Sequence, residues 1–232
     1  MANHLIIDFY GLPGSGKSTL SHRVAEMLRK AGYSISEVSY DMDHRHREIM
    51  RFLLKLKNAL LLLLHSPNTF SRLSSIVKQT GFSVFSTSFY RQLLNIAYKV
   101  HGAKYGDGND IQFFDEGFCQ SVLSLYYNKA DTFSESTIEK IVMLLGELKK
   151  IEYVFVETDF STIQKRLHCR LDGDSRMERL SEKDMTRILE EQEHLCLKLP
   201  STFLVDNKEG QTLTKNCEML YNHIIEKINT GQ

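Results

Sequence analysis

The stretch Gly11-Leu12-Pro13-Gly14-Ser15-Gly16-Lys17-Ser18 decides the fold of this chain. It fits the pattern GxxxxGK[ST], it follows an apolar run at 4–10, and it opens a segment with helical periodicity that continues to Ala31. Glycines let a backbone wrap round phosphate groups with its N–H groups pointing inward, and the N-terminus of a helix adds positive potential. We therefore predict a strand, a phosphate-binding loop (P-loop) and a helix, in that order.

The side chains of this loop predict a nucleotide site that also holds Mg²⁺. Lys17 is expected to reach the β- and γ-phosphates of the nucleotide, and the Ser18 hydroxyl is expected to coordinate the metal. The residues expected to contact the nucleotide are Gly11, Pro13, Gly14, Ser15, Gly16, Lys17, Ser18 and Thr19.

Outside the loop, short apolar runs alternate with longer helical patterns, which is typical of strand–helix units around a parallel sheet. The runs expected to form strands lie at 4–10, 33–40, 111–115, 151–157 and 201–206. We therefore expect an α/β fold of three layers around a five-stranded parallel sheet, the P-loop NTPase fold. No linker rich in Pro, Ser or Gly divides the chain, so residues 1–232 are expected to form a single domain.

The segment 44–109 separates the second and third expected strands by more residues than a simple crossover needs, and its patterns predict a helical insertion. Within it, the Leu-rich stretch 52–64 is too short and too often interrupted by polar residues to cross a bilayer, so a buried helix is expected. The aromatic side chains of the insertion are expected in the core, with a wall that stacks on a ligand as the alternative. They are Phe82, Phe85, Phe89 and Tyr90.

The chain has 232 residues, with 29 Lys and Arg against 29 Asp and Glu, so its formal net charge is zero. This balance argues against a dedicated binder of nucleic acid or anionic membrane, whose affinity would rest on a basic surplus. Hydrophobic residues make up 42% of the chain, which predicts a folded globular protein. The four cysteines are too far apart for a CxxC zinc site, and the N-terminus lacks a signal-peptide pattern, so reduced thiols and a cytoplasmic location are expected.

Two neighbouring carboxylates, Asp115 and Glu116, stand at the end of the third expected strand. Ligands of open α/β sheets bind at the carboxyl ends of the strands, so Asp115 fits an acid that holds the Mg²⁺ shell. Glu116 is expected to orient a water molecule or the group that accepts a phosphoryl. An Asp in this place can also cap a helix, and that alternative stays open.

The sequence Asn128-Lys129-Ala130-Asp131 matches NKxD, a pattern that reads guanine in GTPases. Two features argue against a GTPase. The residues Asp115-Glu116-Gly117-Phe118 do not fit DxxG, and the NKxD match follows them too closely for the intervening strand–helix units. We favour a helix end and a turn at 128–131.

The P-loop, the acid after the third strand and the pattern of the C-terminal third resemble the P-loop small-molecule kinases. This group includes nucleoside monophosphate kinases, thymidylate kinase and adenylylsulfate kinase. In such kinases, the fourth strand is followed by a helix with an Arg-x-x-x-Arg pair that leads into a lid. Here Arg166 and Arg170 have that spacing, and the polar loop Asp172-Gly173-Asp174-Ser175-Arg176 follows them.

The resemblance implies a role for each of these basic residues. Arg166 would pack on the adenine face, while Arg170 and Arg176 would contact phosphates and offset charge during transfer. These residues would belong to a lid region at 166–180. Asn207 would lie in the base-side loop that follows the fifth strand.

The run from Tyr40 to Arg47 is similar to the Asp-x-Asp motif of adenylylsulfate kinases, although its basic residues are displaced and doubled. Asp43, or Asp41 as the second choice, would accept the proton of the acceptor hydroxyl, and Arg45 and Arg47 would face an anionic group on the acceptor. Two alternatives stay open. One is a helix N-cap followed by a basic turn, and the other is a metal site built from Asp41, Asp43, His44 and His46.

We therefore expect an ATP-dependent kinase of a small molecule, a nucleotide or nucleotide-like metabolite, with ATP and Mg²⁺ as cofactors and the acceptor bound by the 44–109 insertion. The alternative is a P-loop NTPase switch or regulatory protein whose hydrolysis is coupled to a protein partner. Neither nucleic acid nor membrane is expected as a partner. A homodimer would use the 52–64 helix if that helix does not belong to the core.

Overall fold

The computed structural model describes residues 5–45, 47–105, 111–128, 134–148, 151–169, 181–208 and 212–230. Over these residues the chain forms a five-stranded sheet in the order β2-β3-β1-β4-β5, in which every pairing is parallel. The predicted α/β fold with a parallel sheet is confirmed. The strands are β1 (Leu5–Tyr10), β2 (Ile35–Glu37), β3 (Ile111–Phe114), β4 (Ile151–Glu157) and β5 (Phe203–Asp206).

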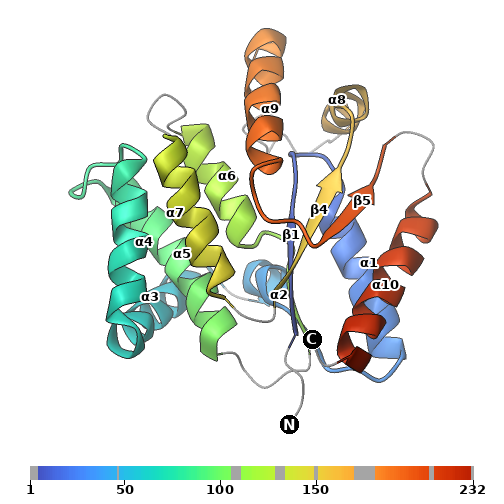
Figure 1. Ribbon diagram of the computed structural model, residues 1–232, viewed down its shortest axis with the longest axis horizontal. Helices are drawn as coiled ribbons and strands as arrows, with labels where there is room; N and C mark the ends of the chain where they lie inside the picture. Colours follow the sequence, from blue (N-terminus) through green and yellow to red (C-terminus); the bar gives the residue numbers. More distant parts are fainter. Residues whose placement is uncertain are drawn as a thin grey trace.

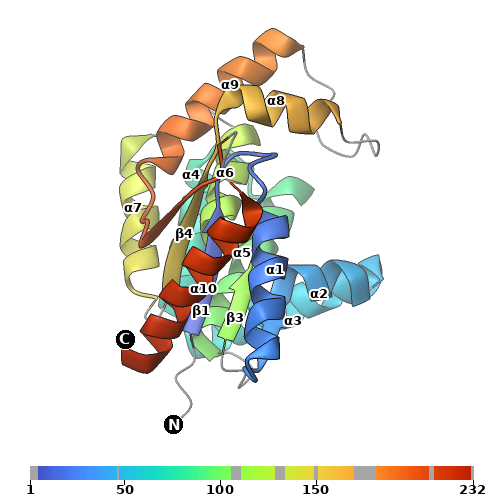
Figure 2. The ribbon, with the colours of Figure 1, turned by 90° about the vertical axis from the view of Figure 1, so that its right-hand side faces the viewer.

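Helices cover both faces of the sheet, which gives the three predicted layers (Figures 1 and 2). Successive residues of a strand point to opposite faces. Accordingly, Leu5, Ile7 and Phe9 of β1 pack in one core with α1 (Lys17–Lys30) and α10 (Leu213–Thr230). Ile6 and Tyr10 belong to the core on the other face, which the remaining large helices cover. The helices after β3 are α6 (Phe118–Asn128), α7 (Glu135–Gly146), α8 (Phe160–His168) and α9 (Glu182–Cys196).

The segment between β2 and β3 is helical, as predicted. It contains α2 (Val38–Arg45), α3 (Glu48–His65), α4 (Pro67–Gln79) and α5 (Thr87–Tyr105). In Figure 1, α3, α4 and α5 stand together beside the sheet, next to α6 and α7. None of the helices in the described ranges combines the length and the hydrophobicity needed to cross a membrane.

The predicted strand at 33–40 was wrong in its second half, because β2 ends at Glu37 and α2 begins at Val38. β2 lies at the edge of the sheet and pairs only with β3, where Glu37 lies opposite Phe113. Because β3 ends at Phe114, the residues after Val38 have no strand to pair with. Their backbone groups form the hydrogen bonds of helix α2 instead.

The expectation that 52–64 is a buried helix was also wrong for most of its leucines. Ala59 and Leu62 of α3 are buried, but Leu53 and Leu60 are about half exposed. At the two ends of the helix, Ile49 keeps 77% and Leu64 keeps 75% of its surface exposed. One side of α3 packs on α4 and α5, and a second apolar side faces outward.

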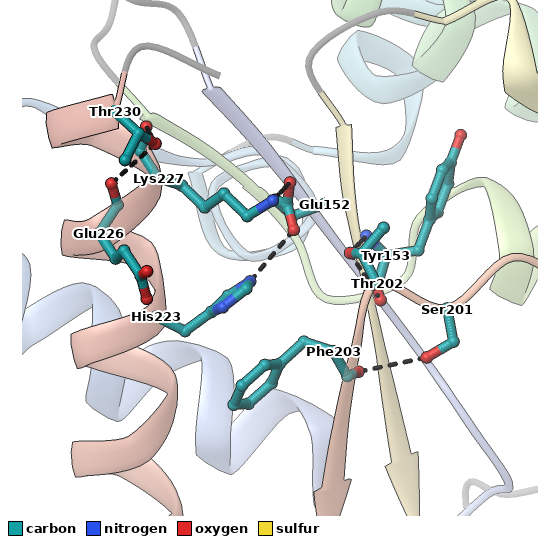
Figure 3. Close-up of polar contacts among 9 residues, drawn as sticks. All are labelled: Glu152, Tyr153, Ser201, Thr202, Phe203, His223, Glu226, Lys227 and Thr230. Atoms are coloured by element: carbon teal, nitrogen blue, oxygen red, sulfur yellow. Dashed lines mark hydrogen bonds and ion pairs between the residues drawn. The ribbon is translucent and has the colours of Figure 1, made fainter.

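Polar side chains of α10 contact Glu152 near the start of β4 (Figure 3). Glu152 lies between two basic side chains, with His223 Nε2 3.1 Å from one carboxylate oxygen and Lys227 Nζ 3.1 Å from the other. The His223 ring also stacks on Phe203 of β5, with 4.3 Å between the ring centroids. These contacts join three elements around one largely buried carboxylate. The four cysteines are free thiols and only Cys169 is exposed, in line with the expectation from their spacing.

Candidate active site

The P-loop begins where β1 ends, and its three glycines adopt backbone angles that favour glycine. The φ angles are +148° at Gly11, +81° at Gly14 and +94° at Gly16. A methyl group added at Gly11 would lie 2.4 Å from the carbonyl oxygen of Val156, and one at Gly16 would lie 2.6 Å from Nδ2 of Asn207. The loop therefore fits closely against the ends of β4 and β5, and only glycine meets both requirements.

One peptide carbonyl of the loop, that of Ser15, is the acceptor for three side chains. It receives hydrogen bonds from Asn207 Nδ2 at 2.6 Å, from Arg166 Nη1 at 3.1 Å and from Thr158 Oγ1 at 3.2 Å. The C=O and N–H groups of a trans peptide point in opposite directions. Holding the Ser15 carbonyl in this way turns the N–H of Gly16 away from the three donors, as a phosphate-binding loop requires.

Lys17 begins α1 with its ammonium group folded over the loop. Its Nζ donates to the carbonyl oxygens of Gly11 and Leu12, each at 3.0 Å, and the residue is 8% exposed. Ser18 and Thr19 are exposed in the same first turn, where backbone N–H groups have no carbonyl partner within the helix. The loop and this turn bring the expected phosphate-binding groups together.

Arg166 and Asn207 contact the P-loop side by side, at the carbonyl of Ser15. The guanidinium group of Arg166 donates to the carbonyls of Gly14 (3.2 Å), Ser15 and Asn207 (3.3 Å). Asn207 is buried, and its side-chain oxygen lies 3.3 Å from Nδ2 of Asn216 on α10. Both residues therefore brace the loop, and stacking of Arg166 on adenine stays a prediction. Arg170 and Arg176, with most of the expected lid, lie outside the described residues.

Asp115 and Glu116 follow β3, which is the neighbour of β1 in the sheet. Asp115 is half-buried and Glu116 is exposed, and both lie at the end of β3 on the edge of the sheet where the P-loop lies. Mg²⁺ binds hard oxygen ligands and in phosphoryl-transfer sites usually needs only one or two from the protein, beside phosphates and water. The Asp115 carboxylate and the Ser18 hydroxyl suit this donor set. Among the residues that the structure describes, no cluster of three or more His, Cys, Asp and Glu side chains forms a separate metal site.

The Asp-x-Asp run lies on helix α2, where a strand end had been predicted. Asp41 is half-buried in this helix, while the side chains of Asp43, His44 and Arg45 are not among those described, and neither is His46. Arg47 is the exposed N-cap residue of α3. The expected roles of Asp41, Asp43, Arg45 and Arg47 toward an acceptor therefore stay predictions.

A cavity of about 110 Å³ opens between α2, α3 and α5, next to the turn that follows β3. One water molecule needs about 10–15 Å³ of such space, so the cavity has room for a group of several heavy atoms. Its lining residues are Ser39, Met42, Lys55, Asn95, Tyr98, Lys99 and Glu116. Sequence reasoning had found only Glu116 among them. The expectation that the aromatic residues of the insertion belong to the core is confirmed for Phe82 and Phe89, and it is wrong for Phe85 and Tyr90, which are exposed.

Asp8 is a second feature that sequence reasoning missed. It lies in the middle of β1, fully buried, and its Oδ2 accepts hydrogen bonds from the backbone N–H groups of Phe118 (2.8 Å) and Cys119 (3.4 Å) at the start of α6. Burial raises the pKa of Asp8 to about 7, although the nearby Lys99 ammonium and these two N–H groups act in the opposite direction. The signal that could have found it is the single charged residue in an otherwise apolar strand.

No family model and no curated protein sequence matches this chain. Solved structures do match it along nearly its whole length. A deoxyadenosine kinase from M. mycoides is 16% identical, with 96% of this chain and 100% of that chain covered and a TM-score of 0.51. A thymidylate kinase from Candida albicans is 19% identical, with 99% and 94% covered and a TM-score of 0.53. The YorR protein from Bacillus subtilis is 16% identical, with 97% and 98% covered and a TM-score of 0.50.

The fold is that of the P-loop small-molecule kinases. In this kinase fold the loop after β1 and the turn after β3 lie at neighbouring positions on one edge of the sheet, and the helices of the insertion border the same turn. The P-loop and the cavity therefore lie near each other, at the carboxyl ends of β1 and β3, where ligands of open α/β sheets bind.

The buried carboxyl of Asp8 predicts an unusual pH dependence of stability in this kinase fold. The pKa of Asp8 is about 7 in the folded chain and 3.8 in its unperturbed state, so between these values the folded chain binds more protons than the unfolded chain. The contribution of Asp8 to the free energy of unfolding therefore falls as pH rises through this window and is least favourable above pH 7. Asp8→Asn removes this titration.

We subtract the free energy of unfolding of the wild type from that of the Asp8→Asn variant. This difference is expected to increase by on the order of 2 kcal/mol between pH 5 and pH 8. Urea unfolding of both proteins across this range measures the difference. Parallel curves for the two proteins would contradict the raised pKa.

Proposed function

We propose that this protein is an ATP-dependent kinase that transfers the γ-phosphoryl group to a small-molecule acceptor, a nucleotide or nucleotide-like metabolite. The observation that supports it most is the cavity bordered by α2, α3 and α5, which adjoins Glu116 at the same sheet edge as the P-loop. A switch protein needs no second small-molecule site, whereas a kinase does. The names of two structural neighbours, a deoxyadenosine kinase and a thymidylate kinase, support an acceptor of the nucleoside or nucleotide class.

In this proposal each group has a positioning or electrostatic task, because phosphoryl transfer depends mainly on alignment and charge stabilisation. The P-loop amides and Lys17 would hold the β- and γ-phosphates. Ser18 and Asp115 would hold Mg²⁺, which supplies neutralisation of phosphate charge when it is bound. Arg170 and Arg176 would add positive charge from the lid, and Asn207 and Arg166 would border the base.

The acceptor would lie in the cavity of the helical insertion. Tyr98 and Met42 offer apolar surface there, Asn95 offers an amide, and the two lysines and Glu116 offer charges. Asp43, or Asp41 in its place, would accept the proton of the acceptor hydroxyl. We place the reaction in the cytoplasm, in line with the reduced thiols.

The test is ATP turnover measured with and without a panel of acceptors that includes nucleosides, nucleoside monophosphates and phosphorylatable sugars. We expect transfer of label from γ-labelled ATP to at least one acceptor class, and loss of that transfer in Asp115→Asn. The matched control is Asp206→Asn, a change of an exposed carboxylate at the end of β5. If ATP is hydrolysed without phosphorylation of any acceptor, and a protein partner accelerates that hydrolysis, the kinase proposal is wrong and the protein is an NTPase switch.

We also propose that the outward side of α3 pairs with a second copy of the chain. Ile49, Leu53, Leu60 and Leu64 recur at helical spacing, and all four are about half exposed or more. An exposed apolar stripe of this kind can meet the same stripe of a second copy about a two-fold axis. Sedimentation analysis is expected to give a dimer for the wild type and a monomer for Leu64→Asp, with unchanged circular dichroism. A monomeric wild type would contradict this assignment.

A further inference from the structure

The turn that carries Asp115 and Glu116 is held from two sides at a single peptide bond, the one between Gly117 and Phe118. The N–H of this peptide donates to Asp8 Oδ2 at 2.8 Å, and its C=O accepts a hydrogen bond from Lys99 Nζ at 3.1 Å. Asp8 comes from β1 and Lys99 from α5, so the contact joins the strand that leads into the P-loop to the helix that lines the cavity.

The two side chains match the polarity of the peptide. The Asp8 carboxyl accepts from the N–H end, and the Lys99 ammonium donates to the C=O end. Both contacts therefore polarise the peptide in the same direction. Burial lowers the pKa of Lys99, whereas the neighbouring Glu116, Asp8 and Asp115 raise it and Lys55 lowers it further. Lys99 is therefore within electrostatic reach of both carboxylates of the turn.

Other contacts leave this turn little freedom. Lys99 Nζ also donates to Ser121 Oγ at 2.7 Å, and Ser121 Oγ donates to the same Gly117 carbonyl at 2.9 Å. On the other side, a methyl group added at Gly117 would lie only 1.8 Å from Asp8 Oδ1. The close approach of the Gly117 backbone to Asp8 excludes any larger residue at this position.

We propose that Asp8 and Lys99 are positioning residues, which hold the Gly117–Phe118 peptide at its two ends and thereby fix the Asp115 and Glu116 carboxylates relative to the P-loop. The inference rests on the proposed function, in which Asp115 holds Mg²⁺ and Glu116 faces the acceptor. Neither Asp8 nor Lys99 needs to touch the nucleotide for this role. Their effect passes through the backbone of the turn to the carboxylates that it carries.

The first experiment compares Lys99→Met with Lys104→Met, a control on the same helix whose exposed ammonium bonds only the Thr69 hydroxyl among the described residues. Binding of a fluorescent ATP analogue is measured with Mg²⁺ and with EDTA. We expect Lys99→Met to weaken the Mg²⁺-dependent binding by about 10- to 100-fold, the range for residues that orient metal ligands, and to leave binding in EDTA unchanged. Lys104→Met is expected to match the wild type in both conditions.

The second experiment separates positioning from packing at Asp8. Gly117→Ala is expected to lower the melting temperature because its methyl group meets Asp8, and adding Asp8→Ala is expected to recover part of this loss by making room for the methyl group. The double variant should still bind Mg²⁺-ATP about tenfold more weakly than the wild type, because the N–H end of the peptide has lost its acceptor. Asp8→Asn, whose amide oxygen can still accept this hydrogen bond, should retain most of the Mg²⁺-dependent affinity.

Three results would overturn the inference. The first is wild-type Mg²⁺-ATP binding in Lys99→Met, and the second is an equal loss of binding with and without Mg²⁺ in that variant. The third is a double variant that recovers both stability and Mg²⁺-ATP affinity, since Asp8 would then matter only for packing. These assays need no acceptor. A wild type that phosphorylates nothing would therefore refute the kinase proposal while the binding data still decide the role of the two residues.

Discussion

Lys17→Ala is expected to lower phosphoryl transfer by at least about 10²–10³-fold, the loss typical for removing one group that stabilises transition-state charge. The Lys17 ammonium folds over the P-loop and donates to the carbonyls of Gly11 and Leu12. With a nucleotide bound, this ammonium would turn to the β- and γ-phosphates, so the variant loses the positive charge nearest to the transferred group. Steady-state turnover with the acceptor found in the panel measures the effect.

The fold of this variant should survive, because Lys17 lies in the first turn of α1 and each of its hydrogen bonds to the carbonyls of Gly11 and Leu12 contributes only about 1 kcal/mol. Lys30→Ala is the matched control, since Lys30 is an exposed lysine in the last turn of the same helix. We expect the control to keep wild-type turnover. Full activity in Lys17→Ala, with thermal unfolding unchanged, would refute the nucleotide site assigned to this loop.

Gly11→Ala is expected to destabilise the folded chain by on the order of 3 kcal/mol or more, and to abolish nucleotide binding in whatever fraction still folds. The new methyl group would lie 2.4 Å from the Val156 carbonyl oxygen, which belongs to a central strand and cannot swing aside. The φ of +148° at Gly11 is itself unfavourable for alanine. For a chain of this size the expected fall in melting temperature is roughly 10 °C.

Gly146→Ala provides the matched control. Gly146 ends α7, and nothing lies within 4 Å of the position that its methyl group would take. Alanine also has the higher helix propensity, so this variant should be as stable as the wild type or more stable by up to about 1 kcal/mol. Equal melting temperatures for Gly11→Ala and the wild type would show that the loop does not pack against β4 as described.

The elements that could be predicted from the sequence are those whose signals are local. β1, the P-loop and α1 follow from fourteen consecutive residues, 5–18, in which an apolar strand, three glycines and a helix start succeed one another. β4 was predicted with its observed bounds because it is a continuous apolar run between polar segments. β2 was predicted too long, since its end depends on the length of β3, a strand more than 70 residues away.

The site divides in the same way. Lys17 was chosen from the P-loop motif, Arg166 and Asn207 were implied by the resemblance to the P-loop kinases, and the structure brings all three together around the loop. Asp8 and Lys99 could not be predicted from a motif, because both contact the Gly117–Phe118 peptide, which no local pattern links to either residue. The cavity is also non-local, since its lining residues come from three helices and a turn. An amphipathic pattern shows which residues avoid water, but not which of them leave a space between helices.

The three hydrogen bonds to the Ser15 carbonyl have a consequence for tracing the ancestry of this protein. The acceptor is a backbone atom, so the contact does not restrict which amino acid stands at position 15. A motif search limited to the P-loop therefore cannot detect it. The donors Thr158, Arg166 and Asn207 carry the whole constraint, and they are spread over fifty positions in the second half of the chain. A distant homologue would therefore be recognised better by the joint presence of these three side chains than by further similarity within the loop.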